Sequence, residues 1–342
     1  MTSDFCFRPS AADITTLACP EGFAPTLTVV VDTEEEFDWS AGFDPANRSV
    51  ANIAEQWHAQ AVFDQFGVVP TYVVDYPVAA NPAAAQALRE FLRQGRCDIG
   101  AHLHPWVTPP DECRVPPALS YPGNLPAPLE FAKLKTLTEK IEDTFGHRPH
   151  IYKAGRYGLG PRTREHLVAL GYRVDVSLVP HTDFSADGGP DYSAVTPAPA
   201  HYGDLLALPL TVTFAGILGG AGAGVFNSIN APIGRALRLP AIAARLGLLE
   251  KLRLSPEGHD LDDMRRQVDA ALRQGIRVFM LTYHSSSLLP GGAPYVRDPA
   301  QRAAFVAKLH GIVSYFLSRP RARSLSVDAL ARALRGSTPD RQ

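Results

Sequence analysis

One short stretch sets the fold that we expect for this chain: Thr26-Leu27-Thr28-Val29-Val30-Val31-Asp32, continuing as Thr33-Glu34-Glu35-Glu36-Phe37-Asp38. Its first six residues are apolar or β-branched, which is typical of a buried strand. The strand then runs directly into a cluster of acidic residues. A buried strand that ends in carboxylates is typical of α/β enzymes, whose sites lie at the carboxyl ends of parallel strands.

Segments of strand and helix character alternate along most of the chain, which predicts a largely parallel sheet. Further strands are expected at 68–74, 97–102, 150–154, 172–178, 205–214 and 277–283, and helices at 51–66, 82–93, 129–145, 162–170, 261–274 and 300–317. About seven strands favour a barrel over a short open sheet. With no internal repeat and no linker, we expect one domain over 1–342, with a core at about 26–335 and an N-terminal extension at 1–25.

Composition argues against several functional classes. The 342 residues carry a formal net charge of -2, which does not suit a nucleic-acid-binding protein. No window reaches the ~18 uncharged apolar residues that a membrane span needs. The first 25 residues carry charged side chains and no apolar signal core, and none of the four cysteines forms a Cys-x-x-Cys pair. We therefore expect a cytoplasmic protein with free thiols.

Two histidines separated by one residue, His102 and His104, lie at the end of an expected strand. Residues i and i+2 of an extended chain point to the same side, so both imidazoles can reach one ion at about 2.0–2.1 Å. Pro105 favours extended backbone before it. A lone histidine is more often a surface or hydrogen-bonding residue, but this pair, near an acidic cluster, predicts a metal site.

The acidic cluster contains more carboxylates than a metal site needs. One of Asp32, Glu34, Glu35 and Glu36 is expected to be the third ligand, and another to act as general base on a water molecule. A solvated acidic turn is the alternative, and the fully apolar strand before the cluster argues against it.

Two further segments carry candidate catalytic groups. After the strand at 150–154, either Lys153 or Arg156 is suited to fix a carboxylate or to stabilise an oxyanion. His284 ends a late strand and is a candidate general acid. The serines that follow it raise the alternative of a serine hydrolase, but the chain has no Gly-x-Ser-x-Gly turn. Gly216–Gly224 does not match a phosphate-binding loop and is expected to be a flexible loop or lid over the site.

The order of these motifs resembles the polysaccharide deacetylase (NodB-homology) family, most closely a branch often labelled WalW-like. The resemblance covers residues from about 26 to 297. It is carried by Asp32–Trp39, Pro70–Pro77, Gly100–Trp106, Ser120–Pro126, Ala154–Gly158, Tyr283–Ser285 and Pro290–Gly291.

The resemblance implies a distorted (β/α) barrel, a divalent metal, usually zinc, and removal of an N-acetyl group from a sugar. It implies that Asp32 is the base, that His284 is the acid, and that the metal ligands are Glu34, His102 and His104. It also implies a cation that orients the base, either Arg156 or Lys153, and an Asp from a fourth motif, for which Asp175 is the nearest candidate. The family usually has adjacent acids and histidines four apart, so this chain departs from both spacings.

We therefore expect a metal-dependent hydrolase of C–N bonds other than peptide bonds, acting on a small-molecule or oligosaccharide substrate, with no organic cofactor. Removal of an N-acetyl group from an amino sugar or glycan is the first expectation. Hydrolysis of a small cyclic amide or ureide, as in allantoinase-like relatives, is the second and suits a cytoplasmic chain. A non-catalytic barrel that serves as a scaffold is the third, and the missing adjacent acid pair supports it slightly.

Overall fold

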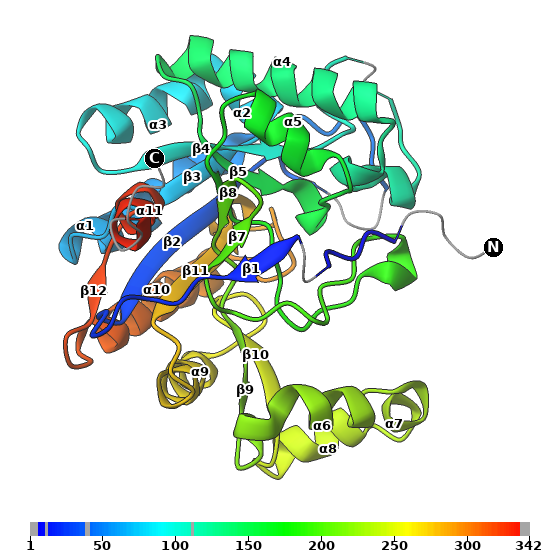
Figure 1. The fold of residues 1–342 in the computed structure, drawn as a ribbon. Helices are drawn as coiled ribbons and strands as arrows, with labels where there is room; N and C mark the ends of the chain where they lie inside the picture. Colours follow the sequence, from blue (N-terminus) through cyan, green and yellow to red (C-terminus); the bar gives the residue numbers. More distant parts are fainter. Residues whose placement is uncertain (1–5, 11–12, 38–41, 111–112, 336–342) are drawn as a thin grey trace.

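A curled, largely parallel sheet forms the centre of the computed structural model, which describes residues 6–10, 13–37, 42–110 and 113–335 (Figure 1). Asp38 and Trp39 of the acidic stretch lie outside the described residues. In spatial order, the parallel strands are β11 (Val278–His284), β2 (Thr26–Thr33), β3 (Thr71–Val74), β4 (Asp98–Leu103), β5 (Ile151–Ala154), β6 (Val174–Asp175) and β8 (Leu205–Ala207).

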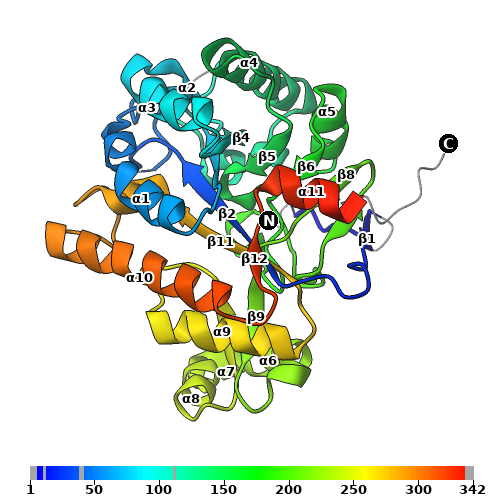
Figure 2. The ribbon, with the colours of Figure 1, turned by 90° about the vertical axis from the view of Figure 1, so that its left-hand side faces the viewer.

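Shorter strands complete this sheet. β7 (Ala200–Tyr202) and β1 (Ile14–Thr16) continue it antiparallel beyond β8, and β12 (Arg323–Ser324) pairs with the start of β2. The sheet curls into a half-barrel, and helices lie around its outside (Figure 2). The expected α/β barrel of NodB type, with about seven parallel strands, is confirmed.

The main helices are α1 (Trp57–Gln65), α2 (Tyr76–Ala80), α3 (Pro82–Arg93), α4 (Ala127–Phe145), α5 (Thr163–Ala169), α9 (Leu261–Arg273), α10 (Pro299–Leu317) and α11 (Val327–Arg335). Several begin where a capping side chain satisfies free backbone N–H groups. Asn81 caps α3, Asp260 forms a capping box at α9, and Asp298 caps α10. Proline occupies the first turn of α3 and α10, where no N–H partner is lost.

The core is centred on β2, in which every residue is buried. Val29, Val30 and Val31 are fully enclosed by a cluster of apolar side chains that extends along the chain from Leu27 to Leu334. A strand covered on both faces can hold the polar residues that follow it in one place. No described helix combines the length and apolarity needed to cross a bilayer, and all four cysteines are free.

The structure corrects two expectations in the segment from 205 to 253. The strand expected at 205–214 is divided into β8 and β9 (Val212–Ala215), because Pro209 between them has no N–H for a strand ladder. β9 pairs instead with β10 (Glu250–Arg253). The Gly-rich segment is not a lid: it forms η6 (Gly219–Ala221) and the start of α6 (Gly222–Ile229).

Together with α7 (Pro232–Ala236) and α8 (Leu239–Arg245), α6 forms a projection next to β9 and β10 (Figure 1). No described side chain of this projection lines the pocket described below.

Candidate active site

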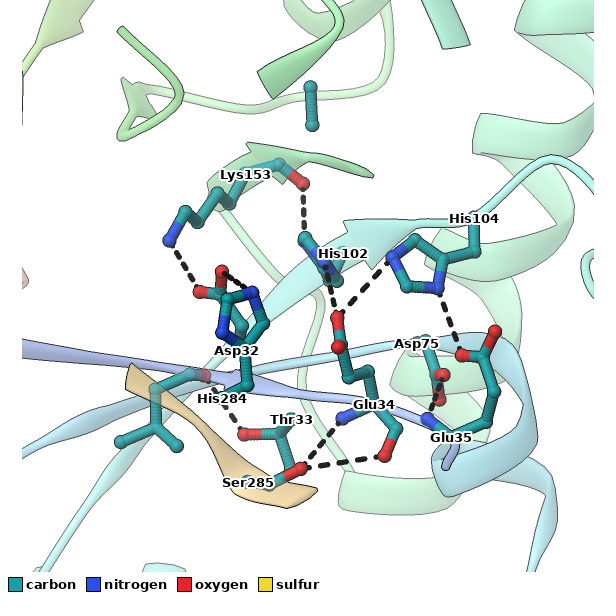
Figure 3. A network of polar contacts seen from close by, with 12 residues as sticks. Asp32, Thr33, Glu34, Glu35, Asp75, His102, His104, Lys153, His284 and Ser285 are labelled. Carbon is teal, nitrogen blue, oxygen red and sulfur yellow. Dashed lines mark hydrogen bonds and ion pairs between the residues drawn. The ribbon is translucent and has the colours of Figure 1, made fainter. Parts of the chain in front are cut away.

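The carboxyl ends of four parallel strands bring the expected site residues together (Figure 3). Asp32 on β2 is paired in register with His284 on β11, and His102 on β4 is paired with Lys153 on β5. These side chains surround a pocket of about 270 Å³, which Asp32, Glu34, His102, His104 and His284 all help to line. A larger hollow of about 850 Å³ near Cys19 and Arg277 contains none of them.

Three ligand-type side chains converge on one point in this pocket. The Nε2 atoms of His102 and His104 lie 3.2 and 3.4 Å from the same oxygen, Oε2 of Glu34. Glu34 lies two residues after Asp32, so both side chains point to one face of an extended chain. All three residues are buried, and burial lowers the pKa of His102 and lowers that of His104 to about 4. Both imidazoles are therefore neutral, as metal ligands must be.

Hydrogen bonds on the far side of each imidazole assign its tautomer. Nδ1 of His102 lies 3.0 Å from the carbonyl oxygen of Lys153, which can only accept, so Nδ1 carries the proton. Nδ1 of His104 lies 2.9 Å from Oε2 of Glu35, which accepts from this Nδ1–H when Asp75 holds the proton of the Glu35–Asp75 pair. Each Nε2 therefore presents a lone pair toward Glu34, and such outer partners also fix ring orientation in metal sites.

This arrangement fits a divalent cation. Burial raises the pKa of Glu34 to about 7, because its carboxylate and two imidazole lone pairs face one another in a buried place; a bound cation would offset that cost. With bonds of about 2.0–2.1 Å, two ligands of a tetrahedral ion lie about 3.3–3.4 Å apart. The observed separations of 3.2 and 3.4 Å between Glu34 and the two imidazoles match that spacing.

Glu35 supports His104 from behind. Its Oε1 accepts a hydrogen bond from the indole N–H of Trp106 at 2.8 Å, and its backbone N–H donates to Oδ2 of Asp75 at 2.7 Å. Glu35, Asp75 and His104 are also close enough to hold an ion. Neither carboxylate lines the pocket, and burial raises the pKa of Glu35 to about 7 and that of Asp75 well above its usual range. Glu35 and Asp75 therefore lie close together because they share a proton, and this second group needs no metal ion.

Glu36 has a different task. Its Oε1 accepts hydrogen bonds from the backbone N–H and the side-chain amide of Asn52, at the start of η1 (Ala51–Glu55). Of the four acids left open by the sequence, only Glu34 faces both Nε2 atoms within the described chain.

The cation beside Asp32 is Lys153. Its ammonium donates to Oδ1 of Asp32 and, at 3.1 Å, to Oγ1 of Thr282, and both charged side chains are buried. Burial alone would raise the pKa of Asp32, but Lys153 and the neighbouring His102 and His284 together outweigh burial and hold that pKa below its ordinary value. The carboxylate therefore stays ionised and can accept a proton.

A residue that the sequence did not reveal, Glu257, holds His284. Its carboxylate accepts hydrogen bonds at 2.9 Å from both the backbone N–H and Nδ1 of His284, and at 2.6 Å from the hydroxyl of Ser287. Burial opposes charge on His284, but Glu257 and other nearby carboxylates raise its pKa well above the usual value. Nε2 of the imidazolium lies 3.6 Å from Oδ2 of Asp32. The only local signal for Glu257 in the sequence is an acid between a proline and a glycine, in Pro256-Glu257-Gly258.

Two expected residues lie elsewhere. Arg156 lines the pocket, but its guanidinium donates to Ser120 Oγ at 2.6 Å and stacks on Tyr121, so it does not orient Asp32. Asp175, at the end of β6, accepts hydrogen bonds from the N–H and hydroxyl of Ser177 at 3.0 and 2.8 Å and does not line the pocket. The acid that lies beside His284 is Glu257.

Two of the three serines after His284, Ser285 and Ser287, have structural partners. Ser285 Oγ accepts the backbone N–H of Glu34 at 3.1 Å, and Ser287 Oγ donates to Glu257. These contacts fix the position of Glu34 and Glu257, and they give no support to a serine nucleophile.

Comparison with known proteins finds the same fold. No protein-family model matches the chain, and no curated protein matches it by sequence. A Mycobacterium smegmatis protein assigned as a polysaccharide deacetylase superimposes with a TM-score of 0.54 at 17% identity, covering 95% of this chain and 96% of that one. Puue allantoinase gives 0.53 at 14% identity, covering 93% of each. A Pseudomonas aeruginosa protein, also assigned as a polysaccharide deacetylase, gives 0.51 at 15% identity, covering 94% of each.

Proposed function

We propose that this chain is a metal-dependent amide hydrolase of the polysaccharide deacetylase superfamily, and that it removes an N-acetyl group from an amino sugar or a related small amide. The observation that carries the proposal is the convergence of two neutral imidazoles on Glu34, with an ionised Asp32 and a protonated His284 in the same pocket. The similarity of fold to two deacetylase-type structures supports it. The WalW-like branch suggested by the sequence and the cytoplasmic location stay predictions.

Glu34, His102 and His104 would hold the cation. Two imidazoles and one carboxylate suit zinc, which accepts nitrogen and oxygen ligands in a tetrahedral site with one position open. Bound there, zinc would supply Lewis acidity toward a water molecule and the acyl oxygen of the substrate.

The remaining residues divide the proton transfers between them. Asp32, kept ionised by Lys153, takes the proton of the attacking water. His284, kept protonated by Glu257, gives its proton to the leaving nitrogen. The two groups lie 3.6 Å apart, so one tetrahedral centre in the pocket can reach both. Opposite displacement of two pKa values within one site is the pattern expected of an acid–base pair.

A second candidate is hydrolysis of a small cyclic amide or ureide. The pocket volume of about 270 Å³ favours it, because this is at the small end for ligand sites and suits one sugar ring or a smaller molecule better than a polymer. The superposition with an allantoinase is compatible with this candidate.

Metal content tests the proposal directly. We expect about one zinc per wild-type chain after supplementation, and none in His102→Ala, His104→Ala or Glu34→Ala. Asp32→Asn should keep the metal and lose turnover, because its carboxylate acts on the proton and not on the ion. Glu36→Gln is the matched control, since this neighbouring acid contacts Asn52 instead and should not change zinc content.

Substrate panels then separate the candidates. Release of acetate from acetylated amino sugars supports the deacetylase, whereas hydrolysis of ureides alone supports the second candidate. Stoichiometric zinc in the His102/His104 double variant would refute the ligand assignment. A supplemented wild-type chain with no metal and no turnover would instead support a scaffold.

A further inference from the structure

Two guanidinium groups line the pocket beside the candidate catalytic residues. Arg253, at the end of β10, and Arg156, in the turn after β5, both border the space that Asp32 and His284 enter. Both are half-buried. No ion pair within 4 Å joins either guanidinium to a carboxylate in the part of the chain that the structure describes. Two other half-buried arginines of this chain pair with carboxylates: Arg302 with Glu55, and Arg96 with Asp64.

Two of the nearby carboxylates, Asp32 and Glu257, are already paired with other cations, and the third, Glu34, would be taken by the metal. Asp32 and Glu257 act on Arg253 through space, but Asp32 is paired with Lys153 and Glu257 with His284. Filling the site with a divalent cation would add further positive charge. With Glu34 bound to that cation, no carboxylate of the pocket is left to pair with Arg253 or Arg156, and a half-buried charge without an ion-pair partner is unfavourable until an anion arrives.

Both arginines have N–H groups that donate to no residue in the described part of the chain. A guanidinium has five N–H donors. Arg253 directs one to the hydroxyl of Tyr157 at 3.0 Å. The Nη1 group of Arg156 donates to Ser120 Oγ at 2.6 Å and to the carbonyl of Pro117 at 3.2 Å. The unused edges have the planar geometry that matches a carboxylate.

Arg156 is also held rigidly. Its guanidinium lies 4.1 Å from the ring centre of Tyr121 and 4.9 Å from that of Phe43. Arg156 and Tyr157 both adopt left-handed backbone conformations, with φ of 51° and 60°. Such strain in non-glycine residues persists mainly at functional sites, where it places a side chain in advance of binding.

We propose that Arg253 and Arg156 form an anion subsite, and that the natural substrate is a small amide bearing a carboxylate. The substrate assignment rests on the proposed hydrolase function, but the subsite itself can be tested without catalysis. The volume of about 270 Å³ leaves room for an acylated amine and a carboxylate a few bonds away. The guanidiniums bind the carboxylate, and its amide then lies among Asp32, His284 and the metal ligands.

The test uses matched pairs of ligands. N-acetylglycine, N-acetyl-β-alanine and N-acetyl-γ-aminobutyrate are each compared with the corresponding carboxamide by isothermal titration calorimetry. The three lengths cover the uncertain distance between amide and carboxylate. Protein treated with a chelator is used, so that carboxylate binding to a metal cannot produce the preference. We expect at least one acid to bind roughly tenfold or more tightly than its carboxamide.

Variants assign the preference to the two arginines. Arg253→Gln and Arg156→Gln should each reduce it about tenfold or abolish it, without weakening carboxamide binding. Tyr157→Phe removes the hydroxyl that Arg253 contacts but no charge, so it should keep the preference. Arg332→Gln, at a side chain that is 74% exposed, controls for net charge alone. Circular dichroism confirms that each variant is folded, and Arg253→Lys should retain part of the preference if Arg253→Gln does not fold.

Several results would overturn the subsite. These are equal affinity for every acid and its carboxamide, no binding of any acid, or a preference that survives both arginine substitutions. The outcome is separable from that of the hydrolase proposal. Tight acid binding with no turnover of any amide would keep the subsite and refute the hydrolase, whereas turnover of neutral amides with no preference for acids would do the reverse.

Discussion

Replacing Glu257 with Gln should lower the pKa of the His284 imidazole. The substitution keeps the size of the side chain, removes the negative charge, and leaves one acceptor oxygen where Glu257 has two. Glu257 accepts two hydrogen bonds from His284, each 2.9 Å long, and is itself buried. The loss therefore acts at short range and is little screened by solvent.

The size of the effect follows from these contacts. A hydrogen bond to a charged group contributes about 1.5–3 kcal/mol. One pKa unit corresponds to about 1.4 kcal/mol, so the pKa of His284 should fall by about 1–2 units. In the wild type this pKa is raised, so the pair contributes stability that is complete below the unfolded pKa and is lost as the pH rises through the folded pKa. Glu257→Gln should reduce that alkaline loss.

Two assays measure the shift. The carbon-bound imidazole protons of His284, followed by NMR against pH, report the pKa without requiring a substrate. Where a substrate is found, the alkaline limb of kcat/KM should move to lower pH by the same amount, because an acid catalyst must be protonated. Ser287→Ala, which removes a neutral donor to Glu257 but keeps the charge, is the control and should shift the pKa much less. An unchanged or higher pKa in Glu257→Gln would refute the proposed role of Glu257.

Three further predictions concern the neighbours of the catalytic groups. Lys153→Met leaves the buried carboxylate of Asp32 unpaired, so it should raise the pKa of Asp32 and move the acidic limb of kcat/KM to higher pH. It should also lower the free energy of unfolding, measured by chemical denaturation, by about 3–5 kcal/mol. An unmoved acidic limb would exclude Asp32 as the base. Glu35→Gln should weaken zinc binding about 10- to 100-fold in a chelator competition, because Glu35 orients His104; unchanged affinity would contradict that role. Gly155→Ala would place a methyl group 2.3 Å from the Leu103 carbonyl oxygen and 2.6 Å from the His104 ring. Because these neighbours must move to make room, the variant should be less stable by about 1–3 kcal/mol and should bind zinc more weakly. Gly220→Ala, where a Cβ meets nothing within 4 Å, is its matched control and should change neither quantity.

Much of the fold could be predicted because its signals are local. The apolar run at 26–31 predicts a buried strand from residue type alone, and β2 begins at Thr26 as expected. α3 spans Pro82–Arg93, the predicted range, because Asn81, Pro82 and the glycine at 95 mark its ends within the sequence. The division of 205–214 was missed, because the pairing of β9 with β10, which lies more than thirty residues later in the chain, is a long-range contact.

The sequence by itself also predicted that His102 and His104 point to the same side of their strand, because side chains alternate along an extended chain whatever strand lies beside it. It placed Asp32, Glu34 and His284 at strand ends but could not say which acid faces both imidazoles. That choice depends on how β2 and β4 are placed on either side of β3. Only the tertiary structure shows Glu34 in that position, with Glu35 behind His104.

The two remaining assignments were decided by packing across the barrel. Lys153 points inward from β5 and meets Asp32, while Arg156 lies past the strand end in a left-handed turn and meets Tyr121. Glu257 reaches His284 from 27 residues earlier in the chain, and no periodicity connects the two. Local patterns fix where a strand ends and which way its side chains alternate, but the partner of each buried charge is chosen by the strands and loops that close around it.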